Sequence, residues 1–182
     1  NSRPDTQDIR GLLEHLAGSV SEGADLSLFQ KSKTPAGQAP TTGIFVVTSD
    51  RGLCGAYNAN VLEEAKKLAA ELEAAEPGRK TKFFVYGKKG YTHLHRRGYD
   101  IERFFVEPPL DRMDFSAAKI VSDALLESFQ AGTVDEVRIA FTRFYSAGRF
   151  RPGHEGFLPI GLTIGQDAGE SDYMSNGDYL LE

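Results

Sequence analysis

Apolar positions along this chain follow two different periods, and the alternation of these periods predicts helices and strands. Near the N-terminus, Ile9, Leu12, Leu13, Leu16, Ala17 and Val20 have helical spacing, which predicts an amphipathic helix over Asp5–Val20. The run Ile44–Val47 is continuous, β-branched and aromatic, as in a strand that is buried on both faces. From Tyr57 the period is helical again. We therefore expect a strand, a short turn and a helix in this part of the chain.

The remaining elements are predicted in the same way. In chain order we expect a strand over Gly43–Thr48, a helix over Ala56–Ala75, a strand over Lys82–Tyr86, a short helix up to about Arg97, a strand over Ile101–Val106, a helix over Phe115–Gln130, and strands over Val137–Phe144 and Phe157–Ile164. Strands that alternate with helices indicate a parallel sheet with both faces covered. Residues 145–156 have no helical period and contain turn formers, so we expect a loop there and antiparallel pairing of the last strand.

These elements predict an α/β fold, a three-layer α/β/α sandwich around a mixed five-stranded sheet whose last strand is antiparallel. We expect residues 1–30 to hold the first helix and a loop, 31–42 a linker, 43–165 the globular α/β domain, and 166–182 an exposed polar loop. The chain begins Asn1-Ser2-Arg3 without methionine, so we expect a processed product or an excised fragment.

Composition narrows the function classes. Hydrophobic residues make up 40% and charged residues 26% of the chain, values of a soluble globular protein. The net charge of −5 gives no general attraction to nucleic acid or to an anionic membrane. The single cysteine excludes an internal disulfide and a cysteine-based metal cage. No apolar run approaches the roughly 18 residues of a membrane-spanning helix.

The turn after the first strand holds an acid, a base and the cysteine, namely Asp50, Arg51 and Cys54. Ligands and partners commonly lie at the carboxyl ends of parallel strands. The spacing Gly52-x-x-Gly55 matches neither the dinucleotide motif nor the P-loop, and no lysine follows, but a small nucleotide-binding enzyme that uses the Asp50–Asn60 turn stays an alternative. A nucleophilic Cys54 lacks a local base. A protein-docking loop and plainly solvated charges are the other two interpretations.

The run Thr48-Ser-Asp-Arg-Gly-Leu-Cys-Gly55, followed by Tyr57-Asn58 and Asn60, resembles the signature of the gamma subunit of rotary ATP synthases, the central stalk. Weaker similarities follow in the family's order: Tyr86-Gly-Lys-Lys-Gly90, then Arg143-Phe-Tyr-Ser146 with Pro152 and Leu158-Pro159, then Gly177–Glu182. Between Ser146 and Pro152 the family's usual Ser-Gln stretch is replaced by Ala147–Arg151, which puts the contacts of this loop in question.

The resemblance implies a torque-transmitting rotor subunit that couples ion flow through a membrane ring to ATP synthesis in the alpha/beta hexamer. It implies no catalysis, cofactor or metal in this chain, and a peripheral position on the cytoplasmic face of a bacterial inner membrane, without membrane insertion. The implied partners are the alpha and beta subunits, the epsilon subunit and the c-ring, and not nucleic acid. The loop implied to face the beta subunits comprises Ser49, Asp50, Arg51, Gly52, Leu53, Cys54 and Gly55.

In this family, long N- and C-terminal helices form a coiled coil. The resemblance implies that Asp5–Val20 is what remains of the first helix here, and that residues 166–182 are an exposed loop and the lead-in to the second. We therefore expect the helix over Asp5–Val20 to expose part of its apolar stripe.

Other polar residues offer weaker signals. His93 and His95 are spaced i, i+2 on a predicted helix and so point apart, which disfavours a shared metal ion. A basic face with Tyr91 is expected to be solvated or to meet protein, and it comprises Lys88, Lys89, Arg96 and Arg97. Arg149, Arg151 and His154 are expected to make the loop before the last strand locally positive.

Overall fold

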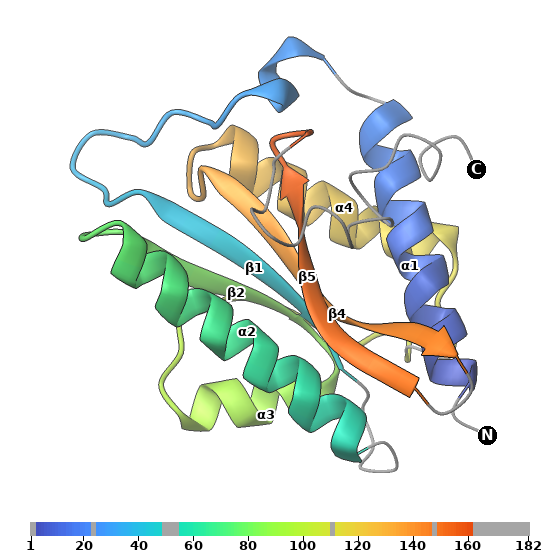
Figure 1. Ribbon diagram of the computed structural model, residues 1–182. Helices are drawn as coiled ribbons and strands as arrows, with labels where there is room; N and C mark the ends of the chain where they lie inside the picture. Colours follow the sequence, from blue (N-terminus) through green and yellow to red (C-terminus); the bar gives the residue numbers. More distant parts are fainter. Residues whose placement is uncertain (1–2, 23–24, 49–54, 110–111, 147–148, 162–182) are drawn as a thin grey trace.

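The computed structural model describes residues 3–22, 25–48, 55–109, 112–146 and 149–161 (Figure 1). Along the chain the elements are α1 (Arg3–Glu22), the 3-10 turn η1 (Leu26–Phe29), β1 (Thr41–Val47), α2 (Gly55–Ala75), β2 (Lys80–Tyr86), α3 (Lys88–Arg96), β3 (Ile101–Phe105), α4 (Phe115–Gln130), β4 (Glu136–Ser146) and β5 (Arg149–Leu158). The helices and the first four strands overlap the predicted segments closely, with ends that differ by a few residues.

The strands form one five-stranded sheet in the order β3-β2-β1-β4-β5. Strand β1 is central and pairs in parallel with β2 on one side and β4 on the other. Strand β3 pairs in parallel with β2, and β5 pairs antiparallel with β4. Helices α2 and α3 cover one face of the sheet, and α1 and α4 cover the other (Figure 1). The predicted mixed sheet, with its last strand antiparallel, is confirmed.

Each face of the sheet has its own hydrophobic core. Side chains of β1 alternate between the two, so Phe45 and Val47 pack with α1 and α4, while Ile44 and Val46 pack with α2. All seven residues of β1 are buried. The unbroken apolar run of this strand is therefore the consequence of having a helical layer on both sides.

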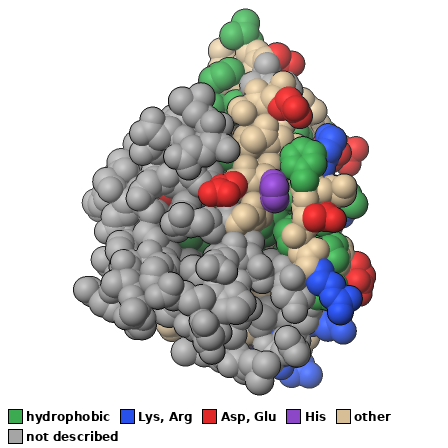
Figure 2. All heavy atoms as spheres, turned by 90° about the vertical axis from the view of Figure 1, so that its right-hand side faces the viewer, with side chains coloured by type: hydrophobic (Ala, Val, Ile, Leu, Met, Phe, Trp, Pro, Cys, Tyr) green, Lys and Arg blue, Asp and Glu red, His purple; other side chains and the backbone are tan. Residues whose placement is uncertain are grey.

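Helix α1 differs from the expectation. Its residues Leu12, Leu13 and Leu16 are completely buried, and the helix packs across α4 and β4. The predicted exposure of its apolar stripe is thus wrong over residues 11–20, because the domain itself covers this stripe. Figure 2 shows the molecule from the side of α1 and α4, where apolar, acidic and basic side chains are mixed over the part of the surface that is described.

The last strand also differs from the expectation. Strand β5 spans Arg149–Leu158 and not Phe157–Ile164, and the register pairs Phe144 with Phe150 and Val137 with Leu158. The predicted loop over 145–156 is therefore mostly strand, and Arg149, Arg151 and His154 lie on β5. Pro152 and Gly153 suggested a turn, but an edge strand accepts both residue types because one of its sides needs no ladder hydrogen bonds.

Candidate functional site

The expected docking turn leaves the sheet at the carboxyl end of β1. Ser49, Asp50, Arg51, Gly52, Leu53 and Cys54 lie outside the described residues, and Gly55 is the first residue of α2. Buried residues lie on either side of this turn. They are Thr48 before it, and Asn58, Val61 and Leu62 of α2 after it.

Thr48 is completely buried and joins β1 to β2 and α3. Its backbone N–H donates to the carbonyl oxygen of Tyr86 at 2.8 Å, beyond the last residue of the strand. Its hydroxyl donates to the same carbonyl at 3.1 Å and accepts from the N–H of Gly90, in the first turn of α3, at 2.9 Å. The chain therefore enters the turn from a fixed point.

Two glycines allow α3 to approach Thr48 this closely. At Gly87 the φ angle is +104°, a conformation that residues with side chains rarely adopt, and an added Cβ would lie 2.1 Å from the carbonyl oxygen of Thr48. At Gly90 an added Cβ would lie 2.8 Å from the hydroxyl oxygen of Thr48. The run Tyr86–Gly90, noted first for its resemblance, has glycine where the backbone needs it.

The basic face lies on α3, beside the same edge of the sheet. Lys88, Lys89, Arg96 and Arg97 are all exposed. The ring of Tyr91 stacks between His95 and Phe104, with centroid distances of 5.2 and 4.3 Å. This arrangement is a charged surface beside a stack of three aromatic rings.

Comparison with known proteins assigns the family. The family model described as ATP synthase matches residues 1–182, the whole chain. The curated relatives include ATP synthase gamma chains of Maridesulfovibrio salexigens, 31% identical over 92% of this chain, and of Chloroherpeton thalassium and Aquifex aeolicus, each 30% identical over all of it. The chain belongs to the ATP synthase gamma-chain family. It spans 55%, 60% and 57% of the lengths of these three relatives.

Solved structures agree with the fold of this gamma-family chain. The central stalk and c-ring structure of the Tetrahymena thermophila mitochondrial ATP synthase contains a chain with a TM-score of 0.51 and 19% identity, which covers 98% of this chain and 85% of that one. The rotor of the Euglena gracilis enzyme contains another, with a TM-score of 0.50 and 18% identity, over 85% of this chain and 56% of that one. Among the described helices of the gamma-family chain, none is long and apolar enough to cross a bilayer.

The histidines of the gamma-family domain lie in separate environments. The Nε2 atom of His93 is buried without a hydrogen-bond partner among the described residues, and burial, together with the charges of Lys66 and Arg97, lowers the pKa of its imidazole. His95 instead stacks on Tyr91. His154, expected in a loop, places its Nε2 atom 3.5 Å from a carboxylate oxygen of Glu64 on α2. Within the described ranges, no three potential metal ligands come together.

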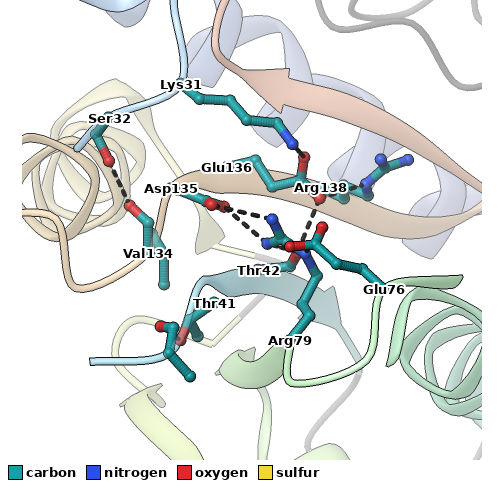
Figure 3. Close-up of polar contacts among 11 residues, drawn as sticks. Lys31, Ser32, Thr41, Thr42, Glu76, Arg79, Val134, Asp135, Glu136 and Arg138 are labelled. Atoms are coloured by element: carbon teal, nitrogen blue, oxygen red, sulfur yellow. Dashed lines mark hydrogen bonds and ion pairs between the residues drawn. The ribbon is translucent and has the colours of Figure 1, made fainter. Parts of the chain in front are cut away.

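The main buried charge cluster lies at the opposite, amino edge of the sheet (Figure 3). Arg79 binds the carboxylate of Asp135 through both terminal nitrogens, at 2.8 and 3.0 Å, and its Nε lies 3.0 Å from Glu76. The Thr42 hydroxyl accepts from Arg79 at 3.0 Å and donates to Glu136 at 2.7 Å. These contacts join the starts of β1, β2 and β4, which periodicity could not reveal because Arg79 and Asp135 are 56 residues apart.

The charges of this cluster compensate one another. The hydrogen bond to Asp135 holds the pKa of Arg79 above its usual range, against the opposing effect of burial. Burial alone would raise the pKa of Glu136, but Arg138, the Thr42 hydroxyl, Lys31 and Arg79 together bring it below its ordinary value. The Lys31 ammonium lies 3.3 Å from the Glu136 carboxylate, so the segment before β1 is tied to the same cluster. The arrangement fits a structural role, because each charge faces a partner.

Proposed function

We propose that this chain is the globular part of a rotor subunit of an ATP synthase. In the complete protein it transmits torque between an ion-driven membrane ring and the alpha/beta hexamer, and it carries out no catalysis itself. The observation that carries the proposal is the match of the family model to the whole of residues 1–182, together with relatives that are gamma chains. The proposal concerns the whole protein, and this chain spans 55–60% of the lengths of these relatives.

The proposed partners divide between the surfaces of the domain. The turn Ser49–Gly55 docks on the beta subunits of the hexamer, and the remaining globular surface binds the epsilon subunit and the membrane c-ring. The complex is peripheral, on the cytoplasmic face of a bacterial inner membrane. Support for docking at the turn comes from its place at the carboxyl edge of the sheet, between the buried Thr48 and the buried residues Asn58, Val61 and Leu62 of α2.

The proposal assigns Arg51 to docking and not to folding, and the variant Arg51→Ala tests this assignment. The variant is placed in the full-length subunit of a complete ATP synthase, and ATP-driven ion pumping is divided by ATP hydrolysis to give a coupling ratio. We expect the ratio to fall several-fold, with the thermal midpoint of the isolated domain unchanged, because exposed loop charges contribute only about 1 kcal/mol or less to folding.

The matched control is Lys119→Ala, which removes an exposed charge from α4, on the other face of the sheet from α2. It should leave both the coupling ratio and the thermal midpoint unchanged. Normal coupling in Arg51→Ala would contradict docking through this turn. A large loss of domain stability would show that Arg51 is a buried structural residue instead.

A further inference from the structure

We infer that Thr48 is a positioning residue for the docking turn. Its hydroxyl ties the residue before the segment Ser49–Cys54 to the first turn of α3, and docking depends on this attachment. The inference rests on the proposed function, in which this turn docks on the beta subunits.

The hydroxyl uses both of its hydrogen-bonding capacities. It donates its proton to the carbonyl of Tyr86 at 3.1 Å and accepts the N–H of Gly90 at 2.9 Å. The two bonds connect Thr48 to the end of β2 and to α3. Because Thr48 is completely buried, no water replaces either partner if the hydroxyl is removed.

Close packing also restricts the position of Thr48. The α-carbons of Gly87 and Gly90 lie so near that an added Cβ would come within 2.1 and 2.8 Å of Thr48 oxygen atoms. In addition, the N–H of Gly87 donates to the carbonyl of Phe105 at 2.9 Å, which ties the end of β3 to the same point. A shift of α3 therefore moves Thr48, and Thr48 is the residue from which the turn begins.

The other end of β1 supplies a matched control. Thr42 is also completely buried, and its hydroxyl also both donates and accepts, with Glu136 at 2.7 Å and Arg79 at 3.0 Å. It lies at the amino edge of the sheet, at the other end of the strand from the residue that precedes the turn. Thr→Val at either position exchanges a hydroxyl for a methyl group of similar size, so the two variants compare the same chemical change at the two ends of one strand.

The experiment uses complete ATP synthase containing the full-length subunit with Thr48→Val, Thr48→Ser or Thr42→Val. The coupling ratio and the amount of assembled enzyme are measured for each. We expect Thr48→Val to lower the coupling ratio several-fold, Thr48→Ser to restore it, and Thr42→Val to keep the ratio of the unaltered enzyme, whatever its effect on stability. Thr48→Ala is measured in parallel, because the smaller side chain leaves room for α3 if the valine prevents assembly.

Hydrogen exchange in the same complexes provides a second measurement. In Thr48→Val the Gly90 amide loses its hydrogen-bond acceptor, so its exchange should be about tenfold faster. In Thr42→Val the exchange rate of the Gly90 amide should be unchanged. Normal coupling in both Thr48→Val and Thr48→Ala, or an equal loss of coupling in Thr42→Val, would overturn the inference. Arg51→Ala in the same assay separates the two claims. If it uncouples while the Thr48 variants do not, only the positioning role fails, and if it does not uncouple, the docking proposal fails as well.

Discussion

Removing Arg79 tests how much of the fold depends on the charge cluster at the amino edge of the sheet. Arg79→Met keeps most of the aliphatic volume but leaves the Asp135 carboxylate without its bidentate partner. The two side chains are only 5% and 7% exposed, so water cannot replace the guanidinium. Breaking such a buried pair from one side costs about 3–5 kcal/mol. That is a large part of the roughly 5–15 kcal/mol that stabilises an ordinary domain.

The measurement is urea unfolding of residues 1–182, followed by circular dichroism, with thermal unfolding beside it. At about 2–4 °C per kcal/mol for a domain of this size, the thermal midpoint should fall by about 6–20 °C. The double variant Arg79→Met/Asp135→Leu should recover much of the loss, because no unpaired charge is left in the interior.

The control for this series is Lys119→Ala. The pair of Lys119 with Asp123 is an exposed i, i+4 contact whose side chains are 53% and 59% exposed, so its removal should change stability by less than about 0.5 kcal/mol. If Arg79→Met costs no more than Lys119→Ala, or if the double variant is less stable than Arg79→Met alone, the paired charges of the cluster do not stabilise the fold.

Three further predictions concern the fold, its pH dependence and ligand binding. Gly87→Ala should cost more than about 3 kcal/mol in urea unfolding, because its Cβ would collide with the Thr48 carbonyl, whereas Gly98→Ala, also at positive φ but with no atom within 4 Å of its Cβ, should cost only about 1 kcal/mol. The pKa of Glu136 is lowered from 4.5, so its contribution is present above that pH and is lost as the pH falls below it; Glu136→Gln should flatten this acid limb of stability, and an unchanged limb would refute the assignment. Titration calorimetry with millimolar Mg-ATP should give no binding heat, and a micromolar site would favour the nucleotide-binding alternative.

The central part of the sheet was predictable, because the apolar pattern of one strand shows whether both of its faces are covered. The run Ile44–Val47 is apolar on both faces, and the structure places a helical layer over each. The missing helical period after residue 144 correctly predicted antiparallel pairing for the last strand. The position of that strand was not predictable in the same way. Pro152 and Gly153 favour a turn locally, and only the facing residues of β4 determine that they lie in β5.

Long-range polar contacts lie beyond what periodicity can predict. Thr48 and Gly90 are 42 residues apart, and the contact joins an uncharged hydroxyl to a backbone N–H, so neither residue type points to the other. The predicted exposure of the apolar stripe of α1 was wrong over residues 11–20 for a related reason. The spacing of Leu12, Leu13 and Leu16 shows that a face is apolar, but it does not show whether a second helix or the domain itself covers that face. The turn residues were identified by resemblance, and their contacts stay a prediction.

Strand β1 is attached at both of its ends by buried side-chain hydroxyls, as well as along both edges by parallel neighbours. Shear between β1 and β4 would have to break the contact between Thr42 and Glu136, and shear between β1 and β2 would have to break the contact between Thr48 and Tyr86. Under mechanical load the centre of the sheet is therefore a stiff element. If force enters through the residue after Thr48, elastic deformation must be taken up outside the sheet.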